Sequence, residues 1–241
     1  MPTQEILIMA VTRMLSGVCT AGFSREPDPL TGLRWVRPVK EHDSLLLGDL
    51  MAADGRVIEP GDVVELALQK PRPAPPHIED WLADFVHHRP RLLRRLEGER
   101  RARFLAEHVD RAPADVLLHA TRSLCLIRPD RVWASFSLDP DSGKYQARLG
   151  FAQGGLTHPQ ANAQRGLPVT DLKWEALGRT WLGQAGGTIE LSHQDLLERT
   201  NAQGIYLALG LSRSYQGQCW PLVIGVHLVP DYRMETDYRA L

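Results

Sequence analysis

The sequence predicts a mainly β protein of the α+β class, with strands in both halves of the chain and helices between them. Three observations support this fold class. Short apolar runs bounded by Gly, Pro or Asp turn signals recur through residues 5–68 and 124–229. Between these regions, apolar residues return at helical spacing. The 241 residues, 43% hydrophobic and 24% charged, have the composition of an ordinary globular protein.

Residues 1–76 are predicted to form a first β unit. Strands are expected at residues 5–11, 33–39 and 62–68, where apolar residues predominate. The glycine-containing segment between the first two strands is expected to be flexible. Four prolines in residues 71–76 indicate a stiff connector at the end of this unit.

Residues 77–121 are predicted to form a helical insertion. Asp80 is a suitable N-cap for a first helix, and Pro90 ends that helix or begins another. Apolar residues then recur at helical spacing through residues 92–105. A third, short helix is expected from Pro113, since proline suits the first turn of a helix.

Residues 122–241 are predicted to form a second β unit. Asp139 to Gly143 form the turn of a hairpin, and Ser192 with Asp195 three residues later begins a helix. The expected order is three strands, one helix and two strands, which is the order of an OB-fold, a five-stranded Greek-key barrel. The five strands are expected at residues 124–128, 132–138, 144–151, 205–211 and 220–229.

Charge, cysteine content and hydropathy exclude several classes of protein. The apolar run near the start, residues 6–11, is far too short for a signal sequence or a spanning helix, so a cytoplasmic protein is expected. Three separated cysteines without a CxxC motif are expected to be buried thiols. The net charge is −1, and 24 of the 28 basic residues are arginine, which suits phosphates and bases but also follows from a GC-rich genome.

Five short segments, spread over residues 6–227, resemble a known family. They read TRM…G.C.AG, G.RWVRPV, PHIEDW, VTDLKW and the pair YLALGLSRS…CWPLVIGVH. In combination they resemble the bacterial dual OB-containing domain family. The resemblance implies two OB-type barrels in one chain. It also implies a role around nucleic acids or nucleotides, in bacterial defence or conflict systems, with no settled enzymatic activity.

Arg13, Trp35 and Arg37 form the first candidate site. Trp35 and Arg37 are two residues apart on an expected strand and therefore share a face. The exposed face of an OB barrel presents aromatic rings for base stacking and arginines for phosphates. In the alternative interpretation, Trp35 belongs to the core and the arginines lie at the rim of the barrel.

Residues 89–103 form the second candidate site. Seven arginines stand against two glutamates, a local net charge of +5. On a helix, these arginines would form an electrostatic surface for a phosphate backbone or an acidic partner, with Arg94, Arg95 and Arg101 as the contacts. The alternative is an ordinary solvated helix face with i,i+4 ion pairs.

Asp171 and Trp174 form the third candidate site. Asp171 would accept a hydrogen bond from a base or a ribose hydroxyl, and Trp174 would stack on the base. Alternatively, Asp171 accepts backbone N–H groups in a turn.

A cluster of histidines and carboxylates, His77, Glu79, Asp80, His87 and His88, follows the Pro-rich connector. These residue types bind divalent metals, but their spacing matches neither HExxH nor HxH. Carboxylates that stabilise a helix N-terminus explain the cluster better, so no metal and no cofactor is predicted.

The sequence therefore predicts a non-catalytic dual OB-fold module that binds single-stranded nucleic acid or a nucleotide, without a membrane segment. No P-loop and no GxSxG motif is present in the sequence. Two alternatives stay open. One is a metal-dependent nuclease or nucleotide hydrolase that uses His77, Glu79 and Asp80 of this cluster, together with Asp171. The other is an adaptor that binds an acidic protein within a larger complex.

Overall fold

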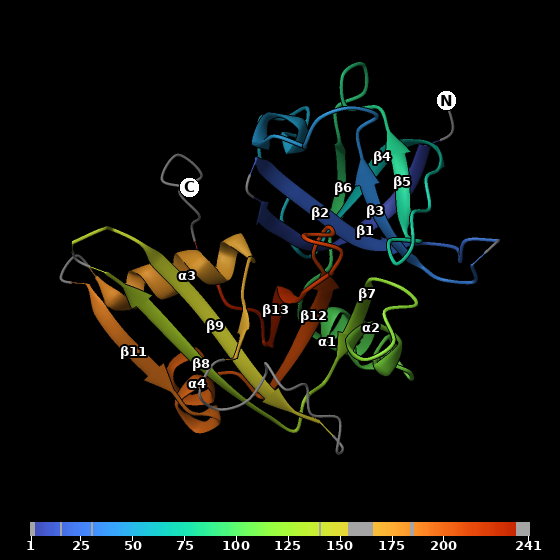
Figure 1. Ribbon diagram of the computed structural model, residues 1–241. Coiled ribbons are helices and arrows are strands. Elements are labelled where there is room, and N and C mark those ends of the chain that lie inside the picture. The colour runs from blue at the N-terminus through green and yellow to red at the C-terminus, as the bar shows by residue number, and fades with distance from the viewer. Residues whose placement is uncertain are drawn as a thin grey trace.

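The structure, a computed structural model, describes residues 3–14, 16–29, 31–139, 141–153, 166–183 and 186–234. Figure 1 shows β1 to β6, in blue to green, above the rest of the chain, with β12 and β13 next to them and with α1 and α2 lower, beside β7. The elements of the first part are β1 (Thr3–Met14), β2 (Gly17–Ser24), β3 (Trp35–Val39), η1 (Leu47–Leu50), β4 (Asp62–Pro71), β5 (Asp80–Ala83), β6 (Arg91–Arg95), α1 (Gly98–Glu107) and α2 (Ala114–Leu117). Those of the second part are β7 (Leu124–Ile127), β8 (Arg131–Leu138), β9 (Tyr145–Ala152), β10 (Leu167–Pro168), α3 (Leu172–Leu182), β11 (Gly187–Leu191), α4 (His193–Thr200), β12 (Gly204–Leu211) and β13 (Pro221–Val229).

The first part contains a closed five-stranded barrel. Its strands follow the order β1-β2-β3-β5-β4, and β4 pairs again with β1 to close the ring. β3 and β5 pair in parallel, whereas the other pairs are antiparallel. A closed five-stranded barrel is the OB architecture, so the prediction of an OB-type barrel is confirmed here. The interior is filled by Ile6, Ile8, Val11, Val18, Val36, Val64, Leu66, Leu68, Ala83 and Phe85.

Two expectations for the first part are wrong. The glycine-containing segment after β1 is the strand β2, which pairs with β1 from Gly17 to Ser24. Asp80 does not cap a helix, because it lies in β5, and residues 91–95 form β6, which pairs with β4. The edges of β3 and β4 need a partner for their backbone N–H and C=O groups, and this pairing outweighs the helical spacing of a short apolar run. The predicted insertion is therefore helical only in α1 and α2, and α2 follows Pro113 as expected.

The second part is built from two sheets around one core. One sheet has the order β10-β9-β8-β11 and the other β13-β12-β7. In the described residues an isolated parallel bridge between Val169 and Val223 links them, so a second closed barrel is not confirmed. The predicted hairpin between β8 and β9 is confirmed, as is the capping box of Ser192 and Asp195 at the start of α4. The core includes Ile127, Phe136, Leu149, Phe151, Trp174, Leu207, Val223 and Leu228.

The three-stranded sheet of the second part covers the outer face of the barrel. Phe23 and Trp35 from the barrel share one apolar cluster with Leu126 and Tyr206 from that sheet. β13 approaches β1 so closely that a Cβ on Gly225 would lie 2.6 Å from the carbonyl oxygen of Met9, which explains a glycine there. The two parts therefore pack face to face through an apolar layer.

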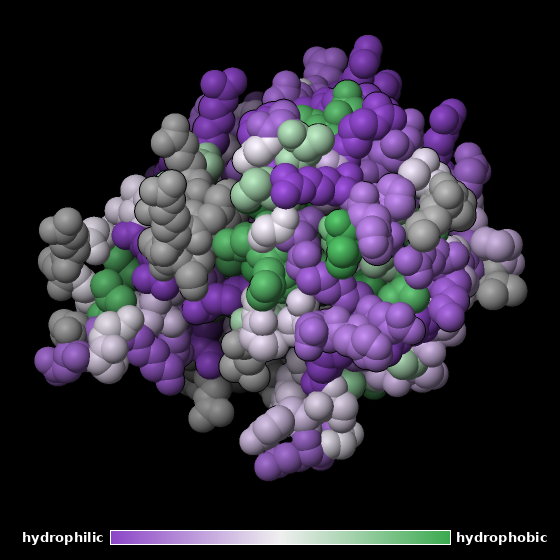
Figure 2. Space-filling view, turned by 90° about the horizontal axis from the view of Figure 1, so that it is seen from above, coloured by the Kyte–Doolittle hydropathy of each residue, from purple (hydrophilic) through white to green (hydrophobic). Residues whose placement is uncertain are grey.

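The outer surface is mainly polar. Figure 2 shows one face as largely hydrophilic, with small hydrophobic areas separated by hydrophilic side chains. In the residues that the structure describes, no helix has the length and the apolar character needed to cross a membrane. The large apolar side chains exposed in that part of the chain are Leu46, Val86, Leu118, Tyr215 and Trp220.

Candidate functional site

Trp35 does not lie on an exposed face. Only 3% of its surface is exposed, and its ring centroid lies 4.3 Å from that of Phe23 in the layer between the two parts. Arg37 is also buried, and its Nε lies 2.6 Å from Oδ1 of Asp80. The core interpretation of Trp35 is therefore the one that the geometry supports, because the second part occupies the face on which the ring lies.

The other predicted residues of the first and third candidate sites support the fold. Arg13 is half exposed and forms an ion pair with Glu175, with Nη2 3.0 Å from Oε1. Asp171 caps α3 by accepting the backbone N–H groups of Lys173 and Trp174, and it also accepts that of Val226 at 2.7 Å. Burial raises the pKa of Asp171 to about 6, against the effect of these donors. Trp174 is fully buried, so neither Asp171 nor Trp174 faces a ligand.

The arginines of residues 89–103 do not form one helical surface, because β6 and α1 divide them. Arg94 pairs with Glu5, and Arg95 pairs with Asp62 at 2.8 Å. Arg101 is buried, where it donates to the carbonyl oxygen of Leu228 at 2.6 Å. Three arginines of the segment form no ion pair or side-chain hydrogen bond with the described residues: Arg89, Arg100 and Arg103.

The histidine and carboxylate cluster is divided among structural roles. Glu79 is buried and accepts the backbone N–H groups of Ser123 and Leu124 and the hydroxyl of Ser123. His87 and His88 both contact the carboxylate of Asp84 in the connection between β5 and β6. In the described ranges, no group of three or more His, Cys, Asp or Glu residues is placed to hold a metal ion.

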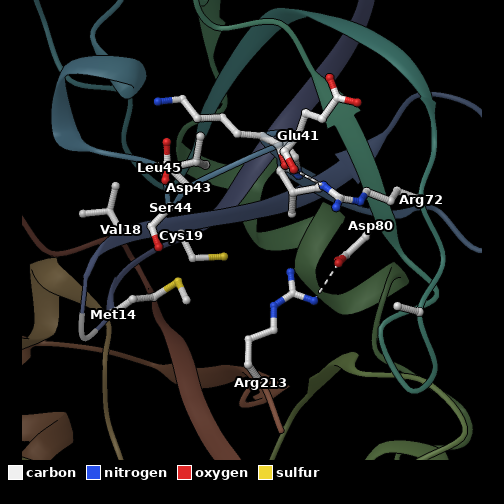
Figure 3. A pocket seen from close by; sticks show the side chains of 14 residues that line it. Met14, Val18, Cys19, Glu41, Asp43, Ser44, Leu45, Arg72, Asp80 and Arg213 are labelled. Atoms are coloured by element: carbon white, nitrogen blue, oxygen red, sulfur yellow. Dashed lines mark hydrogen bonds and ion pairs between the residues drawn. The ribbon is translucent and has the colours of Figure 1, made fainter.

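A cavity of about 370 Å³ opens at the ends of β2 and β3 (Figure 3). Its lining comes from the paired ends of β1 and β2, from the connection that follows β3, from the β4–β5 connection and, through Arg213, from the β12–β13 connection. OB-folds bind oligonucleotides and oligosaccharides at this place. The volume lies in the range of small-molecule sites, about 300–1,000 Å³. The lining residues are Met14, Val18, Cys19, Pro38, Val39, Lys40, Glu41, Asp43, Ser44, Leu45, Arg72, Ala74, Asp80 and Arg213.

Two guanidinium groups reach this cavity, one from the β4–β5 connection and one from the β12–β13 connection. Arg213 extends toward Asp80, with Nη1 2.7 Å from Oδ2, and 43% of its side chain is exposed (Figure 3). Arg72 donates from Nη1 to the carbonyl oxygens of Lys40 and Glu41 at 2.8 and 3.0 Å. Both groups are therefore held in place while part of each guanidinium keeps free donors.

The Cys19 thiol and the His77 imidazole are neutral at neutral pH. Burial raises the pKa of the Cys19 thiol. Burial, helped by the positive charges of Arg37 and Arg213, lowers the pKa of His77 to about 4. Cys19 and Cys219 are partly exposed, so the expectation of a buried thiol is correct only for Cys125.

A second cavity, of about 380 Å³, lies beside the connection between β2 and β3. Its charged lining comprises Glu5, Glu26 and Asp28 against Arg25. This net negative lining opposes an anionic ligand, whereas in the first cavity Lys40, Arg72 and Arg213 balance Glu41, Asp43 and Asp80.

Sequence reasoning missed the β12–β13 connection, which supplies Arg213. Its tip is a two-residue turn in which Gln216 and Gly217 have φ of 52° and 79°, and Tyr215 pairs with Gln218 across it. Glycine at the second central position between two apolar strands is the signal of such a hairpin, and it was present in the sequence.

The comparisons with known proteins agree with the barrel. No curated protein and no solved structure matches the chain. The model of one family, described as the dual OB-containing domain, matches residues 4–226. This match includes the closed barrel, the strands that line the first cavity and the β12–β13 connection. The chain therefore belongs to the dual OB-containing domain family.

Proposed function

We propose that this protein is a non-catalytic OB-fold module that binds a nucleotide, either free or as one unit of single-stranded nucleic acid. The cavity at the ends of β2 and β3 is the proposed site. One observation carries the proposal: Arg72 and Arg213 face a single cavity at the place where OB-folds bind their ligands.

The lining of the cavity suits the parts of a nucleotide. Arginine has five N–H donors, and the ion pair with Asp80 or the two carbonyl contacts use only some of them. The remaining donors of Arg72 and Arg213 can form the bidentate, charge-assisted hydrogen bonds that phosphates favour. Met14, Val18 and Leu45 give the cavity an apolar wall against which a base or sugar would pack.

The proposal replaces the ligand surface expected from the sequence. Stacking on Trp35 or Trp174 would require unpacking the apolar layer or the second core. A cytoplasmic location, expected from the short apolar runs of the sequence, and a role in a bacterial defence system, implied by the family resemblance, are part of the proposal as its biological context.

Calorimetric titration with nucleoside mono-, di- and triphosphates tests the proposal. Hydrogen bonds to charged groups contribute about 1.5–3 kcal/mol each, so R213A and R72A should each weaken binding by about tenfold to about a hundredfold. R56A is the matched control, because Arg56 is exposed and pairs with Asp54 outside the cavity. R94A tests the surface predicted from the sequence, and we expect unchanged affinity.

Binding that is unchanged in R213A and R72A, or that is lost in R94A instead, would overturn the proposed site. Absence of binding to any nucleotide at low salt would overturn the function. Affinity should also fall as the salt concentration rises, because phosphate contacts by arginine release counterions.

A further inference from the structure

The connection between β12 and β13 is a hairpin with an extra residue in one arm. Leu211 pairs with Pro221, and Tyr215 pairs with Gln218, so the arm from 212 to 214 has one residue more than the arm from 219 to 220. Such a bulge redirects the local side chains. Here it lies beside Arg213, whose guanidinium reaches Asp80 of the barrel (Figure 3).

The two faces of this hairpin differ. Cys219 faces the barrel, with Sγ 4.0 Å from Nε2 of His77. Because side chains alternate along a strand, its neighbours Gln218 and Trp220 point to the opposite face. Tyr215, which pairs with Gln218, shares that face. Both rings are exposed, as this orientation requires: 68% of the surface of Tyr215 and 42% of that of Trp220 is accessible.

We propose that Tyr215 and Trp220 form a base-stacking platform for single-stranded nucleic acid. This inference rests on the proposed function and extends it: the ligand of the cavity is one nucleotide of a strand, and the neighbouring nucleotides lie on the hairpin. Arg213 joins the two sites, since it lines the cavity and lies two residues before Tyr215.

The spacing of the two rings suits stacked bases. Tyr215 and Trp220 are diagonal partners across the hairpin, a relation that places residues about 7–8 Å apart. Rings carried on residues at this backbone separation, about twice the rise of about 3.4 Å per nucleotide, leave room for one base between them. The tight turn at the tip holds the arms in register and lowers the entropy cost of ordering the rings on binding.

The surroundings favour a nucleic acid over a protein as the occupant. Ser214, Gln216 and Gln218 are polar, so the two rings are isolated and do not form a broad apolar patch. A stable protein interface buries about 800 Å² on each partner, far more than two rings offer. Aromatic rings beside arginines are instead the pattern of single-strand binding.

A length series of oligonucleotides tests the inference. Wild-type protein, Y215A, W220A and the double variant are titrated with thymidine monophosphate, with oligothymidylates of two to ten nucleotides and with oligouridylates of the same lengths. V86A is the matched control, because Val86 is exposed elsewhere, in the β5–β6 connection. Stacking contributes about 1–3 kcal/mol per base, so each alanine should weaken oligonucleotide binding by about fivefold to about a hundredfold. Binding of the mononucleotide should be unchanged.

Tryptophan fluorescence gives a second measurement. Trp220 is more exposed than the buried Trp35 and Trp174. An oligonucleotide should therefore quench part of the emission in wild-type protein, and this part should be absent in W220F. Y215F should retain affinity, because the ring that stacks is kept.

The outcomes separate the two proposals. If the mononucleotide binds, but affinity does not rise with length and the alanine variants equal wild type, the platform is wrong and the nucleotide site stands. If oligonucleotides bind in a way that Y215A and W220A weaken while R72A has no effect, the platform stands and the cavity is wrong. If no nucleotide or oligonucleotide binds, both proposals are wrong.

Discussion

Replacing Glu79 with alanine should destabilise the protein more than any surface substitution, because Glu79 joins the barrel to the second part. It directly precedes β5, and its carboxylate accepts three hydrogen bonds at 2.9, 2.9 and 3.0 Å from Ser123 and Leu124, at the start of β7. All three residues are buried, so these groups are shielded from bulk water in the folded protein. E79A would leave two backbone N–H groups and a hydroxyl without this partner.

The magnitude follows from these contacts. A buried donor left unsatisfied costs about 1–3 kcal/mol, and the Ser123 hydroxyl is able to rotate toward another acceptor. We therefore expect E79A to lower the free energy of unfolding by about 3–5 kcal/mol, a large part of the about 5–15 kcal/mol of a typical domain. E79Q retains one acceptor oxygen and should lose about half as much.

Urea unfolding, followed in parallel by circular dichroism and tryptophan fluorescence, measures this loss. E65A is the matched control, because Glu65 is partly exposed and pairs with the exposed Arg91, which is worth at most about 1 kcal/mol. Since Glu79 connects the two parts, E79A should also separate the two transitions, which coincide when unfolding is cooperative. A loss for E79A no larger than that for E65A would refute this account of the contact.

Three further predictions concern packing and pH. G225A should lower the free energy of unfolding by about 1–3 kcal/mol, because its Cβ would lie 2.6 Å from the carbonyl oxygen of Met9. G48A, with open space around the added Cβ, should leave the stability unchanged, and equal stabilities of the two variants in urea unfolding would contradict this account. Burial lowers the pKa of His77 from 6.5 to about 4, so the unfolded chain takes up the proton first, and His77 should reduce stability as the pH falls from about 6.5 to about 4. Burial raises the pKa of Asp171 from 3.8 to about 6, so the folded protein takes up the proton first, and Asp171 should increase stability as the pH falls from about 6 to about 4. Urea unfolding at a series of pH values gives the slope of the free energy of unfolding against pH. H77Q and D171N should change this slope in opposite directions, and changes in the same direction would show that one of the two assignments is wrong.

Much of the β structure could be predicted from the sequence, because the strands carry strong apolar patterns. β1, β4, β12 and β13 were expected near their observed bounds. β2 was missed because its small residues resemble a loop when its pairing with β1 is unknown. β5 and β6 were missed because they are short, and their strand conformation depends on β3 and β4 rather than on local spacing.

The site was harder to predict than the fold, for a physical reason. The choice of Trp35 assumed that the outer face of the barrel is open, whereas α1 and the three-stranded sheet of β7, β12 and β13 pack on that face and bury it. The charged groups of Arg37, Arg101 and Asp171 could bind a ligand, but each forms a hydrogen bond with a buried group of the same chain instead. Arg213 lies far along the sequence from Arg72, so the cavity becomes visible only when both parts are folded together.

The apolar layer between the two parts has a consequence for how the chain is made. The ribosome completes the barrel strands and α1 before the strands that cover them, β12 and β13, more than ninety residues later. At about 5–20 residues per second, the part of this apolar layer that β12 and β13 cover stays exposed on the nascent barrel for several seconds or longer. A fragment that ends before β12 should therefore aggregate or recruit chaperones, although its barrel is closed. The gene is thus best expressed whole, and separate production of the barrel requires polar substitutions on that face.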